Sequence, residues 1–497
     1  MLGNNRKKVK THYLERSLIM FKHFKGGSFR VFSDADVKAV HEASVYLLEK
    51  VGIKMHNEQA RQIFADSGAA VDHESRIVKI PRAMIEDAID STPSSLVLCG
   101  REEKNDLLLE GSNVHLGTGG TVLNTLDLES GKKRLTGVRD VAGYAKMTDA
   151  LDNIAFFVIN CYPNDVPTDD VDINRFYHAL ANTSKHVMGG IYTMEGLRDV
   201  ISMAEDIAGG AKKLRERPFV SFITLMMSPL LMEVTYTDFL IEVARRGLPI
   251  ATPSEPLAGA NSPVTLAGTI ALNNAESLGG LILAQLVNPG NPTIYGSTSS
   301  IMDMRTGTYM AGSIESALIN AGCAQMAQHY KIPIYGTGGM SDSKVVDAQA
   351  GYESANTAMV VALSGCNYIH DAFGLLEFCT TLSYEKMVVD NDSVGMALRA
   401  VKGVEVNRET LATDIIAEVG PGGHFLDNAH TVQHVRNEFY FPKLADRQQR
   451  SVWEEAGSKD AFTRAHEEAR RILAEHQPLG FSDDLEKKLR EKYAGIK

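Results

Sequence analysis

The sequence predicts an α/β protein built on a (β/α)8 TIM barrel, with an N-terminal α+β extension and C-terminal helices. From about residue 153, short apolar runs alternate with longer segments of helical spacing, a pattern typical of parallel strands. The eight runs are residues 154–161, 186–191, 219–226, 249–253, 293–297, 332–336, 368–371 and 387–390. Eight such units over ~250 residues match the size of a barrel. A doubly wound sheet, the alternative, usually carries a G-x-G-x-x-G turn after its first strand, and the sequence has none.

The segment before the barrel divides into a leader and a mixed region. Residues 1–20 carry the basic cluster Arg6, Lys7, Lys8 and Lys10, and we expect a loose leader there because chain ends are usually loose. Residues 21–150 form the α+β region. Its first helix begins at the N-cap pattern of residues 33–36 and ends near Gly52, and further helices are expected at 58–67 and 81–91. Strands are expected at 77–80 and 96–98, and a hairpin arm at 115–128 closes at 129–131.

The remaining chain is assigned to the barrel and to helices outside it. We expect the barrel to occupy residues 151–446. The tail, residues 447–497, is highly charged and helical in pattern, with helices expected at 460–475 and 482–493. Packing against the outside of the barrel is the simplest role for them.

Charge and cysteine content exclude several classes of protein. The net charge of -11 argues against nucleic acid as a main partner, because phosphate binding needs a basic surface. The five cysteines form no C-x-x-C pair, which fits reduced thiols in the cytoplasm and removes the usual structural zinc signatures. We find no signal peptide and expect no membrane span, because no apolar stretch approaches the ~20 residues that a span needs.

The carboxyl ends of the predicted strands carry the candidate site, because active sites of barrels lie at those ends. Aromatic residues recur there: Tyr162, Tyr192, Tyr295, Tyr335 and Phe373. Aromatic faces bind quaternary ammonium ions by cation–π attraction. Each ring could equally serve packing, so the sequence leaves a cation cage and ordinary core residues both open.

Glycines and titratable residues share these strand ends. The glycines are Gly117, Gly119, Gly120, Gly336, Gly338 and Gly339. They leave room for a bulky partner or satisfy turn geometry. His370 and Asp371 could form an acid–base or orienting pair or be structural, and Glu255 could be a counter-charge for a cation. No local spacing supports a metal site, and nothing in the sequence pairs Cys161 with a base.

Five segments resemble the trimethylamine methyltransferase family, and the resemblance extends along nearly the whole chain from about Phe21. They are HLGTGGTVLNTLDLESGKKR (115–134), SEPLAGANSPVTLAGT (254–269), GTGGMSDSKVVDAQAGYES (336–354), VVDNDSVGMALRAVKGVEV (388–406) and GPGGHFLDNAHTVQHVRNEFYFPKLADR (420–447). The resemblance implies a barrel enzyme that transfers a methyl group to a cognate corrinoid protein. Trimethylamine-specific members carry pyrrolysine in the barrel, whereas this chain is written in the standard twenty letters. The position of pyrrolysine in those members would correspond to residues 336–341 of this chain.

Members without pyrrolysine resemble quaternary-amine demethylases, so the resemblance implies glycine betaine as substrate and dimethylglycine as product. Proline betaine, carnitine and γ-butyrobetaine are alternatives within the family. A metal-dependent barrel enzyme and a non-catalytic betaine-binding protein are alternatives outside it. No tightly bound cofactor is expected, since the corrinoid (cobalamin-type) group belongs to the partner, and we expect a homo-oligomer.

The resemblance also suggests roles for the candidate residues. Tyr162, Tyr295, Tyr335 and Phe373 would cage the trimethylammonium group, with Glu255 as its counter-charge. His370 or Arg305 would meet a substrate carboxylate. The two glycine strips, 117–120 and 336–339, would flank the approach of the corrinoid. No catalytic side chain is assigned, because the nucleophile is expected to be Co(I) of the partner.

Overall fold

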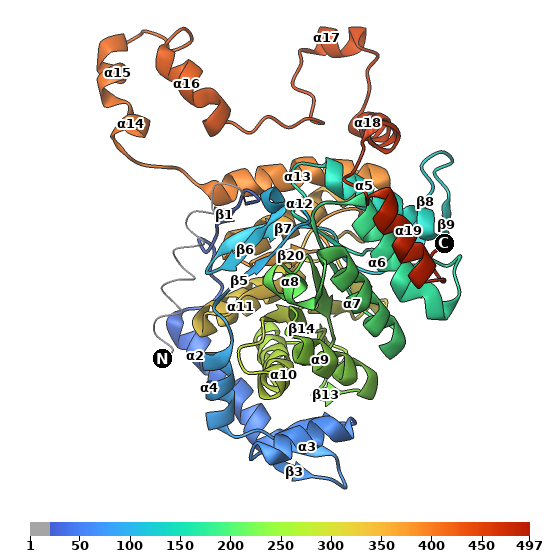
Figure 1. Ribbon diagram of the computed structural model, residues 1–497. Helices are drawn as coiled ribbons and strands as arrows, with labels where there is room; N and C mark the ends of the chain where they lie inside the picture. The colour runs from blue at the N-terminus through green and yellow to red at the C-terminus, as the bar shows by residue number, and fades with distance from the viewer. Residues whose placement is uncertain (1–19) are drawn as a thin grey trace.

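The computed structural model describes residues 20–497, and it shows a mixed α/β protein around one strongly curled sheet of nine strands (Figure 1). Neighbouring strands are β1 (Phe24–Lys25), β7 (Asn113–Leu116), β20 (Tyr368–His370), β19 (Ile334–Thr337), β16 (Thr293–Ser297), β14 (Ile250–Ser254), β12 (Val220–Ile223), β11 (His186–Gly189) and β10 (Phe156–Val158). All these pairs are parallel except β1–β7. The amide of Ala155, just before β10, donates to the carbonyl of Leu116 in β7 at 2.8 Å, so the two ends of the parallel run meet.

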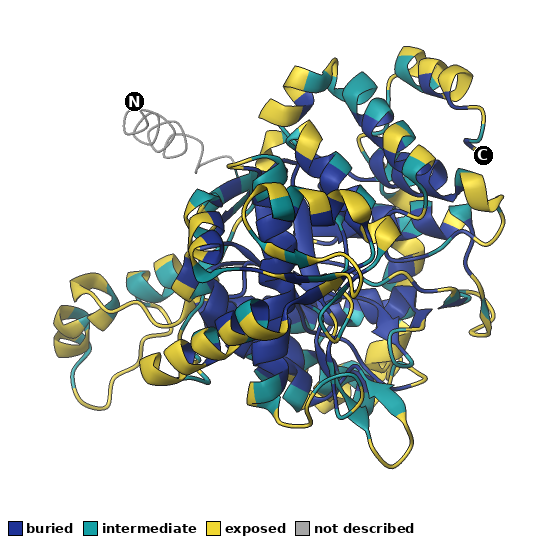
Figure 2. Ribbon diagram, turned by 90° about the horizontal axis from the view of Figure 1, so that it is seen from below, coloured by how far each residue is buried: buried dark blue, intermediate teal, exposed yellow. Residues whose placement is uncertain are grey.

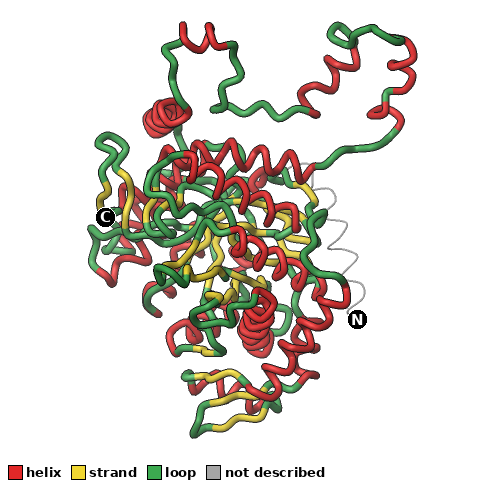
Figure 3. Tube along the Cα trace, turned by 180° about the vertical axis from the view of Figure 1, so that it is seen from behind, coloured by secondary structure: helices red, strands yellow, loops and turns green. Residues whose placement is uncertain are grey.

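Helices surround this sheet on its outer side (Figure 3). In chain order they are α5 (Val138–Ala150), α6 (Val171–Asn182), α7 (Met194–Ala208), α8 (Ala211–Glu216), α9 (Val234–Arg246), α10 (Leu266–Val287), α11 (Ile314–Tyr330), α12 (Ala348–Ser364) and α13 (Tyr384–Lys402). Successive side chains of a strand point to opposite faces. One face of the sheet therefore packs on these helices, and the other faces the interior of the curl.

The interior is filled with aromatic rings and closed at one end. The ring of Tyr368 stacks on Phe156, with centroids 3.5 Å apart, and lies 5.6 Å from the ring of Tyr335. Strands β5 (Ser95–Leu98) and β6 (Leu107–Glu110) form a hairpin whose leucines join this cluster. The hairpin lies at the strand starts, since Cys99 N donates to the carbonyl of Pro218 just before β12. Only the end at the strand carboxyl termini is left for a ligand.

Helix α10 departs from the expectation that no segment is apolar enough to span a membrane. Among the described residues it alone passes that test by length and composition, but 89% of its apolar window is buried inside the protein. It packs against β14 and β16, so its apolar surface belongs to the core.

The N-terminal region confirms most of the predicted elements. Ser33 caps α2 (Asp34–Tyr46) in a capping box with Asp36, and a π-helical turn (Leu47–Val51) ends at Gly52, whose φ is 83°. The elements that follow are β2 (Ile53–Met55), α3 (Glu58–Asp66), β3 (Ala70–Asp72), β4 (Ile77–Lys79) and α4 (Arg82–Ser91). The three strands form a small sheet with β13 (Leu231–Met232). The predicted leader lies almost entirely outside the described residues.

Two predictions about the barrel strands are corrected. The predicted strand at 387–390 is wrong: these residues lie within α13, where Lys386 and Asp390 form an ion pair one helical turn apart. The apolar run there is too short to separate a buried strand from a buried helix. The missing parallel strand is β7, which was expected to belong to the hairpin arm. The hairpin itself starts later, with β8 (Asn124–Leu126) and β9 (Lys133–Leu135).

Short strands at the carboxyl ends of the sheet build the walls around its open end. Strands β15 (Leu257–Ala258), β17 (Ser300–Asp303) and β18 (Thr308–Met310) form one sheet. Strands β21 (Leu375–Leu376) and β22 (Thr381–Leu382) join β8 and β9 in another. Both sheets contain strands that directly follow strands of the curled sheet.

The C-terminal part contains one projecting segment and two packed helices. The projecting segment, residues 404–441, is called the arm below and contains α14 (Arg408–Leu411), α15 (Thr413–Val419) and α16 (Ala429–Glu438). Figures 1 and 2 show that it stands away from the body and is largely exposed. After α17 (Arg450–Glu455), helices α18 (Ala461–Glu475) and α19 (Asp483–Lys492) pack on the body and confirm the predicted tail helices.

Candidate active site

A cavity of about 430 Å³ lies at the carboxyl ends of the parallel strands. Its lining includes Val158 after β10, Gly190 after β11, Ile223 at the end of β12, Tyr335 in β19 and His370 in β20. A cavity of about 460 Å³ also lies between α13 and α18, outside the curled sheet. We assign the site to the first cavity, because the strand ends and the walls around them converge on it.

Two carboxyl groups and one imidazole face this cavity. Glu255 follows β14, and burial, together with the nearby Asp371 carboxylate, raises its pKa to about 7 while His370 opposes the rise. The Thr337 hydroxyl donates to Oδ2 of Asp371 at 2.7 Å, and Nε2 of His370 lies 2.9 Å from the same oxygen. The cavity therefore holds two carboxyl groups close together, an arrangement that favours a cationic ligand.

The backbone fixes the orientation of His370 and Asp371. Nδ1 of His370 lies 2.7 Å from the carbonyl of Gly336 and must donate to it, since a carbonyl only accepts. Asp371 has φ 66°, a left-handed conformation that side chains other than glycine rarely adopt. Its Oδ1 is buried without a hydrogen-bond partner. An unsatisfied buried carboxylate oxygen and local strain together are typical of a functional position.

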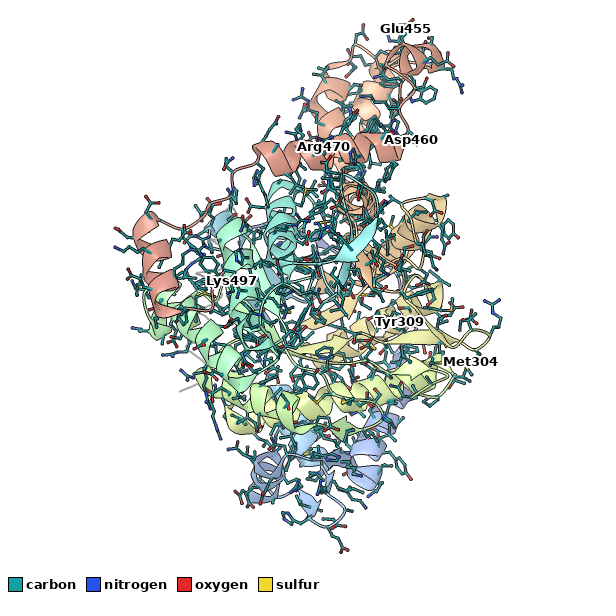
Figure 4. All side chains as sticks on the ribbon, turned by 90° about the vertical axis from the view of Figure 1, so that its right-hand side faces the viewer. Met304, Tyr309, Glu455, Asp460, Arg470 and Lys497 are labelled. Atoms are coloured by element: carbon teal, nitrogen blue, oxygen red, sulfur yellow. The ribbon has the colours of Figure 1, made fainter. Side chains whose placement is uncertain are left out.

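Aromatic side chains from several elements surround the acidic cluster. The Tyr335 ring stacks on His370, with ring centroids 4.1 Å apart. Tyr192 follows β11, Tyr236 comes from α9, and Tyr309 comes from β18. Figure 4 shows Tyr309 at the base of the β17–β18 hairpin, whose tip carries Met304. The cavity thus offers π faces on several sides, as a cation site requires.

Phe378 and Cys379 reach the cavity through an unusual loop. Glu377, Phe378 and Cys379 have φ angles of 51°, 59° and 62°, so three consecutive residues other than glycine are left-handed. Each such residue is strained by about 1–2 kcal/mol. The ammonium group of Lys344 lies 4.1 Å from the centroid of the Phe378 ring, which holds that ring from outside.

Arg175 supplies the positive charge on the cavity wall. It comes from α6 and is 1% exposed. Its guanidinium donates to the carbonyl of Gly190 at 2.8 Å, the Thr121 hydroxyl at 3.0 Å and the carbonyl of Ile159 at 3.1 Å. A guanidinium has five N–H donors, so donors remain for a ligand. Its position 5.3 Å from the centre of the Tyr192 ring places cation and π face side by side.

The glycines allow close contact between strand-end loops. A Cβ on Gly119 would overlap Asp371, and one on Gly117 would overlap the Phe156 ring. Gly120 lines the cavity with φ 79°. A Cβ on Gly336 would meet Cys366, and one on Gly338 would meet α12, so these two glycines face outward. Gly339 packs on Ala372.

The structure brings together only part of the predicted site. Tyr335, His370, Glu255 and Gly120 line the cavity. Tyr162 is not among the residues that line the cavity, but its ring contacts that of Tyr192, with ring centroids 5.4 Å apart.

Three predicted residues lie elsewhere, and the predicted cage is corrected accordingly. Tyr295 is fully buried on the outer face of β16 and donates to Oδ1 of Asn274 in α10 at 3.0 Å. Phe373 is buried in the core between sheet and helices. The Arg305 side chain is 85% exposed and forms an ion pair with Asp303 at 2.8 Å.

Sequence reasoning missed the residues that other elements contribute. These are Arg175, Tyr236, Tyr309, Phe378 and Cys379. None of them ends a barrel strand, so the rule that located the others could not find them. Within residues 20–497 no group of three or more His, Cys, Asp or Glu side chains is arranged to hold a metal ion.

An α/β fold with one cavity at its strand ends, lined by acids, π faces and an arginine, defines an enzyme that handles a small charged molecule. The family model for trimethylamine methyltransferase (MTTB) matches residues 3–495, and the chain belongs to this family. It is therefore a methyltransferase of the EC 2.1.1 class for methylamine- or betaine-type substrates, and members of the family methylate corrinoid proteins.

Two curated relatives agree with this assignment. The chain is 40% identical over 459 residues to the trimethylamine methyltransferase MttB of Desulfitobacterium hafniense (strain DSM 10664 / DCB-2), with 92% of each chain covered. It is 34% identical over 464 residues to the glycine betaine methyltransferase of Desulfitobacterium hafniense (strain Y51), with 93% of this chain and 96% of the relative covered. The crystal structure of the Methanosarcina barkeri monomethylamine methyltransferase (MtmB) superposes with a TM-score of 0.46 at 13% identity, covering 94% of this chain and 98% of that one.

Proposed function

We propose that this protein takes a methyl group from a quaternary amine that also carries a carboxylate, with glycine betaine the foremost candidate, and passes it to the reduced corrinoid of a partner protein. One observation carries the proposal: a single cavity holds carboxylates and π faces for a cation and a buried arginine for an anion. A betaine presents both charges within one small molecule.

We also propose that the curled sheet is a (β/α)8 barrel. Its eight parallel strands would be β7, β10, β11, β12, β14, β16, β19 and β20, with closure between β7 and β10. The hydrogen bond from Ala155 to Leu116 and the bridge between Val122 and Cys161 support this closure. In a barrel the cavity is the open mouth, which is where a bulky partner group can approach.

The side chains divide the two ends of the substrate between them. Glu255, Asp371 and the rings of Tyr309 and Tyr335 would hold the trimethylammonium group. Arg175 would meet the carboxylate, in place of the predicted Arg305, whose side chain is in solvent. A cation over an aromatic face contributes about 0.5–2 kcal/mol per ring, and a hydrogen bond to a charged group about 1.5–3 kcal/mol.

The transfer itself needs no proton movement. The partner's Co(I) corrinoid would supply the electron pair that takes the methyl group, and the C–N bonding pair would stay on nitrogen, so dimethylglycine would leave with a neutral amine nitrogen and its carboxylate still negative. The residues of this chain bind, orient and exclude water, which places the methyl group in line for displacement. A quaternary nitrogen needs no activation, and this agrees with a chain that is written without pyrrolysine.

A substrate panel tests the proposal. Purified protein is mixed with Co(I) cobalamin and glycine betaine, proline betaine, carnitine, γ-butyrobetaine, choline or trimethylamine, and methylated corrinoid and demethylated amine are measured together. We expect a betaine to be the best substrate and choline, which lacks the carboxylate, to be poor. Activity on trimethylamine alone, or no preference for betaines over choline, would overturn the proposal.

Arg175 provides the sharper variant. Arg175→Met should raise the KM for the betaine roughly 10- to 100-fold, the equivalent of one charged hydrogen bond, and leave the weak reaction with choline unchanged. Arg175→Lys keeps the positive charge, so its KM for the betaine should lie between that of the native protein and that of Arg175→Met. Arg175 also donates to three backbone and side-chain acceptors, so its loss could disturb the structure. The readout is therefore the ratio of the activity with the betaine to the activity with choline, because structural damage lowers both activities equally.

A further inference from the structure

The arm, residues 404–441, contains helices that cannot be stable as they stand. Helices α14, α15 and α16 have 4, 7 and 10 residues, and none of them contains a buried residue. Isolated helices shorter than about 12–15 residues are marginal in water, and helices in proteins gain most of their stability from packing an apolar face. The arm therefore needs a surface that the rest of the chain does not provide.

The arm also exposes an unusual amount of apolar surface. Its exposed large side chains include Leu411, Ile416, Phe425, Leu426, Val432 and Phe439. Leu426 is 85% exposed and Val432 is 72% exposed. Taken together, the exposed apolar side chains of the arm offer on the order of 1000 Å², and a stable interface needs about 800 Å² from each partner. Contiguous apolar patches larger than several hundred Å² mark interaction sites in folded proteins.

The position of the arm argues against the corrinoid protein as its partner. Helix α13 begins at Tyr384, five residues after Cys379 in the cavity wall, and ends at Lys402, where the arm starts. Its 19 residues span about 28 Å at 1.5 Å per residue. The arm thus leaves the body at the end of α13 remote from the cavity, and Figures 1 and 3 show it projecting from there. A protein that must present its corrinoid at the cavity mouth docks at the other end.

The apolar surface of the arm needs a permanent partner, and a second copy of this chain can provide one. A partner that dissociates after each transfer would leave the arm bare in every cycle, whereas a second copy covers it permanently. A two-fold arrangement uses the same patch on both copies and closes on itself. We propose that the arm is a dimerisation arm, which packs across a second copy of this chain while that copy's arm packs across the first.

The two ends of the arm lie together, so it can be removed cleanly. Nε of Arg399 donates to the carbonyl of Glu438 at 2.7 Å, and Nζ of Lys402 donates to the carbonyl of Asn437 at 2.6 Å. Replacing residues 404–436 by a short Gly/Ser linker therefore leaves the body connected without strain.

Sedimentation and light scattering of the full chain at about micromolar concentration test the proposal. We expect a dimer or a higher even multiple for the native protein and half that mass for the arm-deleted variant. The double variant Leu426→Asp/Val432→Asp should weaken self-association by at least about 100-fold, since each buried apolar anchor contributes about 2 kcal/mol or more. Leu479→Asp, at an exposed leucine outside the arm, should leave the mass unchanged.

The outcomes that overturn the proposal are equally definite. A monomeric native protein overturns it, and so does a double variant that is folded by circular dichroism and keeps the native mass. Titration with the corrinoid protein distinguishes the other occupant: an arm-deleted variant that loses affinity for that protein while the native chain is monomeric shows that the arm binds the partner instead. Because these readouts need no methyl transfer, they stand apart from the proposed function.

Discussion

The charge of Glu255 should control how tightly the substrate binds between pH 6 and pH 8. Its side chain is accessible from the cavity, and desolvation by the surrounding protein, followed by the neighbouring Asp371 carboxylate, raises its pKa to about 7. The carboxyl group is therefore neutral below pH 7 and negative above it. A quaternary ammonium has no proton to lose, so any change of affinity in this range belongs to the protein.

The size of the effect follows from the titration. A group with a pKa of about 7 is roughly 10% ionised at pH 6 and roughly 90% ionised at pH 8. If only the ionised form bound the cation, the apparent Kd would fall about 10-fold over that interval, which is the upper limit of the effect. Unit charges about 5 Å apart interact by about 3 kcal/mol at an effective dielectric constant near 20, and water in the open cavity reduces this to about 1–2 kcal/mol. Glu255→Gln should therefore weaken binding at pH 8 by about 5- to 30-fold.

Calorimetric titration of the full chain with glycine betaine measures the effect without the corrinoid partner. We expect the Kd of the native protein to fall with pH and that of Glu255→Gln to stay nearly level. Asp303→Asn is the matched control, because this carboxylate pairs with Arg305 away from the cavity and its pKa is lowered to about 2 by that guanidinium. A pH-independent Kd in the native protein, or the same slope in Glu255→Gln, would refute the reasoning.

Three further predictions concern the cavity and the core. Gly119→Ala should reduce methyl transfer at least about 10-fold in a folded protein, because the new Cβ displaces Asp371. The control is Gly351→Ala in α12, whose new Cβ meets open space and which should stabilise the helix by about 0.5–1 kcal/mol in urea unfolding. Equal methyl-transfer activity of the two variants would contradict this prediction. Tyr309→Leu should raise the KM for a betaine about 3- to 10-fold and Tyr309→Phe should not, since only the π face matters; steady-state kinetics decide between these outcomes. Lys185→Met should lower the free energy of unfolding by about 2–4 kcal/mol, because Nζ of this buried lysine donates to three carbonyls; an unchanged urea midpoint would disprove it.

The course of the sheet was largely predictable from the sequence. Apart from residues 387–390, every apolar run that was predicted as a strand contains one, because buried parallel strands are nearly uninterrupted apolar stretches. Strand β7 was not predicted as part of the parallel sheet because it carries two polar residues, Asn113 and His115. Both are buried, and their side chains lie within hydrogen-bonding distance of the carbonyl of Leu108 in the β5–β6 hairpin, which closes the interior at the strand starts. That compensation depends on a tertiary contact and leaves no trace in the local pattern.

The part of the site that follows from strand ends was predictable, and the part that other elements contribute was not. His370, Glu255 and Tyr335 were found because they lie at the ends of strands of the curled sheet or follow them directly. Arg175 comes from the middle of a helix, and Tyr309 comes from a hairpin inserted after β16. Only the packing of those elements over the mouth of the sheet brings them to the cavity.

The error at Tyr295 has a single geometric cause. Tyr295 and Tyr335 each precede a glycine near the end of a predicted strand, and the prediction treated them as equivalent. In the structure Gly296 is the partner of Tyr335, and Tyr295 is paired with Ile334. Neighbouring residues of a strand face opposite sides, so Tyr335 points into the interior and Tyr295 points to α10. A shift of β16 by one residue would turn Tyr295 inward and Gly296 toward the helix, and it would place a second tyrosine beside Tyr335 in the interior. The proposed cation site therefore depends on the β16–β19 register, which the local sequence alone does not specify.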